Sequence, residues 1–176
     1  MKYFHFSELD STNDWAKSYC RSDQSDTHFV VTCDQQRKGR GTNGREWYSQ
    51  AGKQLLVTLA YARTPQRLDV HAVQALISSV IQEEVLQFYG LSLEKEWPND
   101  LLLNNKKCAG ILVESFVHQE TQWLIIGLGL NVNTTCFPDA LTHVATSFYL
   151  ESGKEYDIQG FVQPLSLALC KGLDVL

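Results

Sequence analysis

The chain has 176 residues, of which 44% are hydrophobic and 20% are charged, and its formal net charge is −5. A chain of this length most often folds as one domain, so we expect residues 1–176 to form a single domain of ordinary globular composition. The acidic balance argues against a dedicated nucleic-acid-binding protein. The chain contains no run of eighteen apolar residues, so we predict no membrane span. The N-terminus does not resemble a signal peptide. The five cysteines have neither zinc-site nor disulfide spacing, which indicates reduced thiols in a cytoplasmic protein.

The N-terminal third of the chain predicts three strands and one helix. Aromatic and β-branched runs predict strands at residues 2–8, 28–33 and 53–60. After the first strand, Ser11-Thr12-Asn13 offers N-cap residues for a helix that reaches about Cys20. Capping explains only one of these three polar side chains. The polar stretch 21–27 predicts a loop.

Two helices and a hairpin are predicted in the remainder. Apolar residues at helical spacing predict a long helix over residues 70–89, ended by Gly90, and a final helix over 158–173 whose first turn is marked by Pro164. The polar residues 119–122 predict a hairpin turn between two apolar runs. Strands are expected at residues 93–97, 101–103, 107–118 and 123–132. Because the strands are mostly adjacent in sequence, we expect an α+β fold with a mixed, largely antiparallel sheet and helices packed on one face.

Residues 36–47 combine three glycines with four cations in an otherwise acidic chain. Glycine allows the backbone to approach a ligand closely, and backbone N–H groups and guanidinium groups suit phosphate or carboxylate oxygens. Residues 39–44 also spell Gly-x-Gly-x-x-Gly, but no helical pattern follows, as a dinucleotide-binding site would need. We interpret residues 36–47 as an anion-binding loop; the alternative is an ordinary solvated loop.

Three further stretches have residue types that packing alone does not explain. Residues 97–100, Trp-Pro-Asn-Asp, place two short polar side chains after a rigid step. Lys107 begins a predicted buried strand, where a lysine is costly unless it is paired; the alternative is a strand-end lysine that reaches solvent. Residues 127–133, Gly-Leu-Gly-Leu-Asn-Val-Asn, place two glycines inside an apolar strand, which indicates either close approach of a ligand or of backbone, or a bulge. Strand alternation puts both asparagines on one face.

Together these stretches resemble the catalytic domain of biotin protein ligases. The motifs of that family occur here in the same order: Ser-Thr-Asn (11–13), Gly-Arg-Gly-x-x-Gly-Arg-x-Trp (39–47), Trp-Pro-Asn-Asp (97–100), Lys-x-x-Gly-Ile-Leu-x-Glu (107–114), Gly-x-Gly-x-Asn-Val-Asn (127–133) and Ala-Thr-Ser (145–147). Each motif is modestly specific, but their ordered occurrence over nearly the whole chain is highly specific. The resemblance implies a fold like that of class II synthetases.

The resemblance also implies a reaction in two steps. The carboxylate of biotin attacks the α-phosphate of ATP in the presence of Mg²⁺, which gives biotinyl-5′-AMP, and a lysine of a biotin carboxyl carrier protein then attacks this mixed anhydride. Negative charge builds up around phosphorus, and fixed cations can stabilise it. The implied partners are biotin, ATP and the carrier protein, without nucleic acid or membrane, and the resemblance is compatible with a homodimer through the central sheet.

Particular residues acquire roles through this resemblance. The implied catalytic residues are Arg40 and Lys107, the latter bridging the biotin carboxylate and the α-phosphate. The implied biotin-binding residues are Ser11, Thr12, Asn13, Gln36, Gly39, Arg40, Gly41, Trp47, Lys107, Gly110, Leu112 and Gly129. The implied nucleotide-binding residues are Arg40, Thr42, Arg45, Trp47, Asn99, Lys107 and Asn131, and Asp100 is the implied ligand of Mg²⁺.

The sequence departs from the family pattern in three ways. Family members commonly carry arginine where Thr42 stands, and often lysine where Glu96 stands, although the adjacent Lys95 could compensate. We expect no counterpart, within residues 1–176, of the small β-barrel domain that usually follows the catalytic domain in this family. We also find no N-terminal winged-helix segment, so we expect no DNA-binding repressor role.

These departures keep two alternative functions open. One is a non-catalytic relative that binds biotin or an adenylate. The other is a lipoate or octanoate transferase of the same fold. It ranks lowest because the chain lacks the Arg-Arg and Gly-Gly-Gly segments, with a following histidine, that the transferases usually carry.

Overall fold

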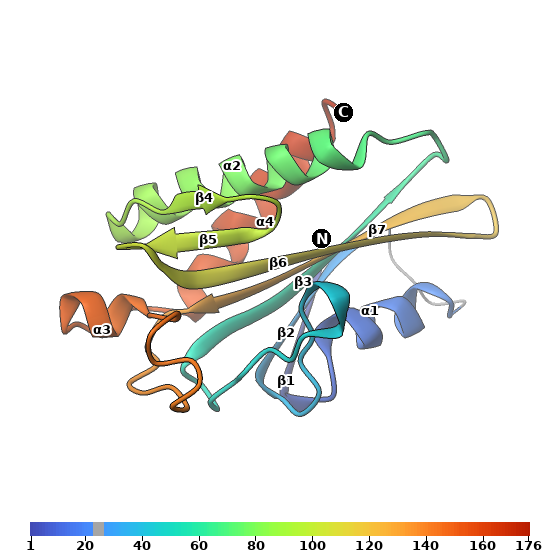
Figure 1. Cartoon of the computed structure of the whole chain (residues 1–176). Helices are drawn as coiled ribbons and strands as arrows, with labels where there is room; N and C mark the ends of the chain where they lie inside the picture. Colours follow the sequence, from blue (N-terminus) through green and yellow to red (C-terminus); the bar gives the residue numbers. More distant parts are fainter. Residues whose placement is uncertain (23–26) are drawn as a thin grey trace. The chain divides into compact units, whose positions relative to one another are not determined.

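The computed structural model describes residues 1–22 and 27–176, so most of the loop predicted at 21–27 lies outside the described residues. Figure 1 shows the strands of the protein, which are β1 (Lys2–Leu9), β2 (His28–Gln36), β3 (Gln54–Arg63), β4 (Glu94–Glu96), β5 (Asp100–Leu103), β6 (Lys106–His118) and β7 (Thr121–Asn131). The helices are α1 (Thr12–Cys20), the 3₁₀ helix η1 (Thr42–Gly44), α2 (Val70–Tyr89), α3 (Phe148–Ser152) and α4 (Gln159–Leu173).

The sheet confirms the predicted α+β class. Its strands are hydrogen-bonded in the order β1-β2-β3-β7-β6-β5-β4. Strands β1 and β2 are parallel, whereas β2–β3, β4–β5 and β5–β6 are antiparallel. Two residues connect β6 to β7, and a connection this short joins antiparallel neighbours. The sheet is therefore mixed and largely antiparallel.

The described chain divides into two compact units. The first unit comprises Met1–Arg67 and Ile111–Gly129, and the second comprises Leu68–Gly110 and Leu130–Leu176. The chain therefore leaves the first unit after β3, returns to it within β6, and leaves it again near the end of β7.

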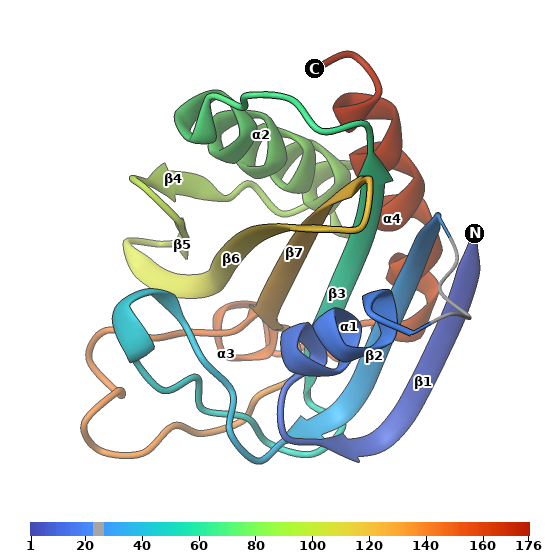
Figure 2. The same cartoon turned by 90° about the vertical axis from the view of Figure 1, so that its right-hand side faces the viewer.

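In the first unit, α1 lies across β2 and β3 (Figure 2). The core between them consists of apolar residues from α1 and three strands, namely Ala16, Cys20, Phe29, Val31, Ala60, Trp123 and Ile125. Residues 29–33 of β2 are buried without alternation, which is the pattern of a strand covered on both faces. Ser11 caps α1, since its side chain accepts a hydrogen bond from Asp14 N. This packing fixes the direction in which the first turn of α1 points.

In the second unit, α2 packs against α4. The Phe88 and Phe161 rings are 5.2 Å apart, and Tyr89 packs on Phe161 at 4.9 Å. Helix α2 has the predicted bounds, and Gly90 ends it in the left-handed conformation (φ 72°). The Trp97–Pro98 peptide bond is cis.

Some predicted bounds were wrong. Strand β7 ends at Asn131, and its hairpin turn needs only Gln119 and Glu120 rather than residues 119–122. The short helix α3 was not predicted. Helix α4 begins at Gln159, so Pro164 lies in its interior instead of marking the first turn. An earlier start is stabilised because the carboxylate of Asp157 accepts the Gly160 N–H (3.0 Å).

Two general expectations concern the thiols and the hydropathy of the helices. All five cysteines are free thiols, as their spacing predicted. Among residues 1–22 and 27–176, no helix is long and apolar enough to cross a membrane.

Candidate functional site

Residues 36–47, the glycine-rich loop, are folded back on themselves. The Trp47 N–H donates to the Gly39 carbonyl (2.9 Å), and the Gly41 N–H donates to the Arg45 carbonyl (2.7 Å). The tip of the loop is the 3₁₀ helix η1, which begins at Thr42. These hydrogen bonds give the loop a defined shape, which a merely solvated loop would lack.

Two cations of the glycine-rich loop form surface ion pairs. Arg37 Nε lies 2.9 Å from Asp10 Oδ1, and a second guanidinium nitrogen lies 3.3 Å from Glu8. Lys38 Nζ lies 3.1 Å from Asp10 Oδ2, and hydrogen bonds from Lys38 and Arg37 lower the pKa of Asp10. Exposed pairs of this kind contribute little stability. They nevertheless neutralise two of the four cations that made the loop look anion-binding.

Arg40 is held by Asp14, in the first turn of α1. Its guanidinium donates to both carboxylate oxygens of Asp14, with Nη2 2.7 Å from Oδ1 and Nη1 in contact with Oδ2. Lys17 Nζ is also 3.1 Å from Asp14. The Arg40 hydrogen bonds lower the pKa of Asp14 to about 2, and the same pairing raises the pKa of Arg40. The main candidate cation of the loop is therefore engaged by a carboxylate that sequence reasoning missed.

A largely buried polar group lies beside this ion pair. Gln36 Oε1 accepts a hydrogen bond from the backbone N–H of Thr12 (2.8 Å) and lies 3.1 Å from the hydroxyl oxygen of Thr12. Asn13 Nδ2 donates to a carboxylate oxygen of Glu114 (2.9 Å) and, more weakly, to the carbonyl of Leu112 (3.4 Å). The structure therefore brings together four predicted residues from α1, β2 and β6, together with Ser11 at the helix cap.

Thr58 of β3 completes this polar group and was not predicted. Its hydroxyl is fully buried and lies 2.8 Å from Thr12 Oγ1 and 2.6 Å from Asn13 Oδ1. The only trace of it in the sequence is one hydroxyl within an otherwise apolar strand. A threonine is common in strands, so this trace had no predictive value.

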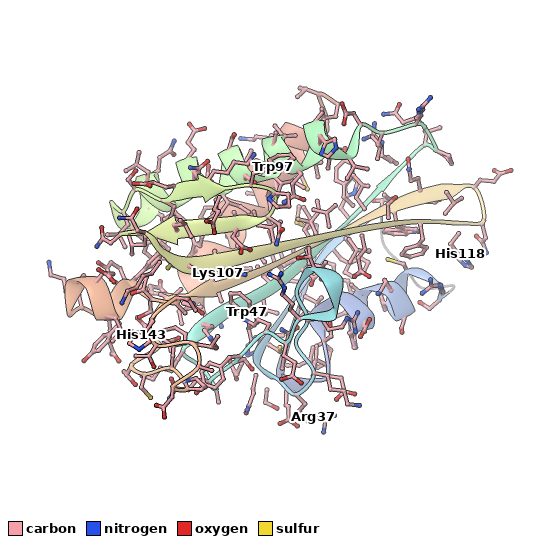
Figure 3. The ribbon with its side chains drawn as sticks, viewed as in Figure 1. Arg37, Trp47, Trp97, Lys107, His118 and His143 are labelled. Carbon is pink, nitrogen blue, oxygen red and sulfur yellow. The ribbon has the colours of Figure 1, made fainter. Side chains whose placement is uncertain are left out.

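Three glycines make room for side chains of the site. A Cβ on Gly129 would lie 2.7 Å from the Trp47 indole nitrogen, and one on Gly127 would overlap the Asn13 carboxamide. A Cβ on Gly39 would lie 2.9 Å from the Trp47 carbonyl. Close approach at Gly127 and Gly129 is therefore found, but the approaching groups are the side chains of Asn13 and Trp47 and not the expected ligand or backbone. Gly129 seats the indole that anchors the glycine-rich loop; Figure 3 labels Trp47.

In the second unit, Lys107 is paired. Its ammonium lies 2.8 Å from Asp100 Oδ1, which also accepts a hydrogen bond from Asn99 Nδ2 (3.0 Å). The backbone of Lys107 is fixed as well, because its N–H donates to the Val144 carbonyl (2.8 Å) and its carbonyl accepts from Thr146 N (2.9 Å). Pairing with Asp100 thus accounts for a partly buried lysine, labelled in Figure 3.

The predicted metal ligand Asp100 does not belong to a metal-binding cluster. Among the described residues, no group of three or more His, Cys, Asp or Glu side chains could hold a metal ion. One oxygen of Asp100 is already occupied by Lys107 and Asn99. The protein side chains alone therefore do not fit a resident Mg²⁺ ion.

Asn131 and Asn133 do not share a strand face, so that expectation was wrong. Strand β7 ends at Asn131, and alternation does not extend beyond it. Asn131 Nδ2 donates to the Thr146 carbonyl (3.0 Å), whereas the Asn133 carboxamide donates to the Tyr156 carbonyl and accepts from Tyr156 N, both at 2.9 Å. Each amide instead fastens a different segment of the chain.

The remaining predicted residues lie nearer the surface. Arg45 is exposed in the glycine-rich loop, and Gly110 is paired with Asp100 across β6 and β5. Lys95, which we expected to compensate for Glu96, lies over the Trp97 ring at 4.8 Å. Its charge is therefore engaged by an aromatic face.

Comparisons with known proteins show which family this chain is similar to. The family model described as Biotin/lipoate A/B protein ligase family matches residues 5–131. The bifunctional ligase/repressor BirA of Bacillus subtilis (strain 168) is 35% identical over 151 residues, which cover 81% of this chain and 45% of that protein. The chain thus spans less than half the length of this curated relative.

Solved structures have the same fold. Biotin protein ligase from Aquifex aeolicus in complex with biotin and ATP has a TM-score of 0.82 at 24% identity, covering 98% of this chain and 70% of that one. Biotin protein ligase from Leishmania major in complex with biotin has a TM-score of 0.75 at 25% identity, covering 94% and 72%. These likenesses support the α+β architecture.

Proposed function

Because the chain belongs to the biotin/lipoate A/B protein ligase family, we propose that it activates biotin with ATP as biotinyl-5′-AMP and transfers biotin to a lysine of a biotin carboxyl carrier protein. The observation that carries this proposal is the polar group formed by the buried Thr12 and Asn13 and the half-buried Gln36 at the base of the glycine-rich loop. We further propose that the two units act as one catalytic domain.

The hydrogen-bonding groups of this cluster suit the cyclic urea of biotin. Gln36 Oε1 is already bound by Thr12, which orients the amide so that Nε2 remains as a donor for a carbonyl oxygen. The hydroxyls of Thr12 and Ser11 can accept hydrogen bonds from the N–H groups of the urea. Asn13 has both ends of its carboxamide bound within the protein, so its proposed role is to hold the cluster rather than to touch biotin.

The remaining biotin-binding residues stay proposals. They are Gly39, Arg40, Gly41, Trp47, Lys107, Gly110, Leu112 and Gly129. Trp47 is the strongest of them, because its indole rests on Gly129 and its backbone closes the glycine-rich loop through Gly39. It would fix the loop over a bound acyl-adenylate.

Activation of biotin needs cations near the reacting oxygens. A carboxylate oxygen of biotin forms a bond to the α-phosphorus while the bond from that phosphorus to the pyrophosphate oxygen breaks. Arg40 and Lys107 are the proposed cations that neutralise the charge of the carboxylate and the phosphate in this step. Each is held by a carboxylate, Asp14 or Asp100, so a substrate anion would exchange with or share that partner.

Transfer needs no covalent protein intermediate. The amine of the carrier lysine attacks the acyl carbon, the bond from that carbon to the AMP oxygen breaks, and the amine gives up a proton. This agrees with thiols that are free and largely buried, since burial raises the pKa of Cys20 and Cys33 to about 12 and leaves them poor nucleophiles.

The nucleotide is assigned to Thr42, Arg45, Trp47, Asn99 and Asn131, together with the two cations. The hydrogen bond from the Asn131 side-chain amide to the Thr146 carbonyl supports this, because it holds the amide beside the Ala-Thr-Ser motif. Mg²⁺ commonly binds through substrate phosphates and one or two carboxylates. We therefore assign no step to a protein-held metal; Mg²⁺ would accompany ATP.

The test is to mix the purified chain with biotin, ATP and a biotin carboxyl carrier domain and to detect labelled carrier by mass spectrometry. We expect a mass increase equal to one biotin, and no increase when ATP is omitted. Folded protein that labels no carrier and forms no biotinyl-5′-AMP would contradict the proposal. Lipoate in place of biotin serves as the control for substrate class, and the matching relatives favour biotin.

A further inference from the structure

A chain of polar side chains leads from Thr12 through the interior of the first unit to Glu114. Thr12 Oγ1 lies 2.8 Å from Thr58 Oγ1, which lies 2.6 Å from Asn13 Oδ1. The other end of the Asn13 carboxamide donates to Glu114 Oε2 (2.9 Å), and the second oxygen of Glu114 is bound by Lys17 (2.8 Å). Only Glu114 and Lys17 reach solvent, since the three residues before them are at most 4% exposed.

The orientation of the Asn13 carboxamide is fixed by its partners. The group that faces Glu114 must be the NH₂, because a carbonyl oxygen there would face a carboxylate oxygen. The same NH₂ faces the carbonyl of Leu112. The end that faces Thr58 is therefore an oxygen, which can only accept.

The hydroxyl hydrogens can then be assigned. Because Asn13 Oδ1 cannot donate, the hydrogen in its 2.6 Å contact is that of Thr58. Thr58 has no second hydrogen, so the 2.8 Å contact with Thr12 uses the hydrogen of Thr12. No hydrogen then lies in the longer contact of 3.1 Å between Thr12 Oγ1 and Gln36 Oε1. Gln36 Oε1 still accepts the hydrogen bond from the backbone N–H of Thr12.

The opposite assignment is less favourable. If Thr12 gave its hydrogen to Gln36, two hydroxyl oxygens would face each other at 2.8 Å with no hydrogen between them. With no hydrogen between Thr12 Oγ1 and Gln36 Oε1, the repulsion between the two oxygens is smaller, because they are 3.1 Å apart. All hydrogens of the chain therefore point from Thr12 towards the negative charge of Glu114.

This polarity makes Thr12 Oγ1 a hydrogen-bond acceptor, because its own hydrogen is given to Thr58. Hydrogen bonds in a chain polarise one another, more so in a buried environment. The charge of Glu114 increases the electron density on Asn13 Oδ1, and through Thr58 on Thr12 Oγ1. A ligand that approaches Thr12 is accordingly met by an acceptor, which selects for an N–H donor.

We propose that Thr58 and Glu114 are positioning residues that orient the Thr12 hydroxyl as an acceptor for one N–H of a cyclic urea, without touching the ligand themselves. This rests on the proposed binding of biotin and names the groups that would recognise its urea. Neither residue was expected to have a role in the site from its sequence position.

The experiment measures binding of biotin and of its two N-monomethyl derivatives to the wild-type chain and to Thr58→Val, by calorimetry. Removing the hydroxyl that takes the Thr12 hydrogen should weaken biotin binding about tenfold. One N-methyl derivative, which lacks the N–H that Thr12 accepts, should bind with nearly the same affinity to both proteins. Thr58→Ser, which restores the hydroxyl, should bind biotin within about twofold of wild type.

Controls separate this inference from a general loss of structure. Thr32→Val removes another buried hydroxyl of the first unit, bonded to His5 and to the Phe4 carbonyl, and should leave biotin affinity unchanged. Glu114→Gln should weaken biotin binding and leave ATP binding unchanged.

Different outcomes overturn different statements. Equal biotin affinity of wild type and Thr58→Val would overturn the inference, and so would an equal loss for biotin and both methylated derivatives, or a Thr58→Ser variant as weak as Thr58→Val. A wild-type chain that binds no biotin would overturn the proposed function itself.

Discussion

Arg40 and Asp14 form a bidentate ion pair that connects the glycine-rich loop to the first turn of α1. The two residues are 26 positions apart, and Asp14 directly follows the motif 11–13 while Arg40 lies in the motif 39–47, but neither motif indicates that they meet. The pair has consequences for stability and for the availability of Arg40.

The first prediction concerns pH. The folded pKa of Asp14 is about 2, below its ordinary 3.8. The pairing therefore contributes stability above about pH 4, and this contribution is lost as the pH falls towards 2. Because the pair is partly exposed, we expect a contribution of only about 1 kcal/mol. Urea unfolding between pH 5 and pH 2 should show a steeper loss of the free energy of unfolding in wild type than in Asp14→Asn.

A suitable control is Asp174→Asn, at the end of α4 and outside this ion pair. Its pH profile should follow that of wild type. Parallel profiles for wild type and Asp14→Asn would contradict the assigned pairing.

The second prediction concerns the seat of Trp47. Gly129→Ala places a methyl group against the indole, so the ring must move and the glycine-rich loop loses its anchor. We expect faster trypsin cleavage after the loop cations and biotin binding weakened about tenfold or more. Limited proteolysis and calorimetry measure these effects. Gly172→Ala, where the added methyl meets the Val80 side chain in a helix, should leave both unchanged.

The third prediction concerns Lys107. Lys107→Met removes the ammonium and leaves Asp100 with one hydrogen-bond donor fewer. If Lys107 neutralises the reacting anions, formation of biotinyl-5′-AMP should fall about a hundredfold or more, with a smaller change in biotin affinity. Exchange of labelled pyrophosphate into ATP measures the first step alone.

Lys106→Met is the matched control, because successive residues of β6 point to opposite faces. It should retain most of the exchange rate. An unchanged rate in Lys107→Met would show that Lys107 has only its structural pairing with Asp100.

The fourth prediction concerns Thr42 at the start of η1. An arginine at this position, as in many family members, adds a cation to a loop in which Arg37, Lys38 and Arg40 are engaged by carboxylates. Thr42→Arg should therefore retain biotinyl-5′-AMP longer, with dissociation slowed about fivefold. Stopped-flow displacement measures the rate, and Thr42→Ala should release the intermediate as fast as wild type does.

Much of the local structure followed from the sequence. The apolar period gave the bounds of α2 and predicted Gly90 as its end, because helix periodicity and a left-handed cap are local properties. The polar residues 11–13 were predicted to have more than a capping role, and two of them do: Thr12 is bonded to the half-buried Gln36, and Asn13 is bonded to Glu114.

The end of β7 and the start of α4 could not be predicted in the same way. Whether Asn133 continues a strand depends on its hydrogen bonds with Tyr156, and the first turn of α4 depends on the side chain of Asp157. These contacts outweigh the signals of alternation and of proline position.

By itself, the sequence determined the order of the strands and of the helices α1, α2 and α4, the family motifs, and the cations and glycines available to bind an anion. Only the tertiary structure decided which of these groups are paired. Asp14 and Thr58 are the clearest examples, since an aspartate in a helix and a threonine in a strand are common. What gives them a role is a partner more than twenty residues away, and a hydrogen bond forms only where folding brings donor and acceptor within about 3 Å.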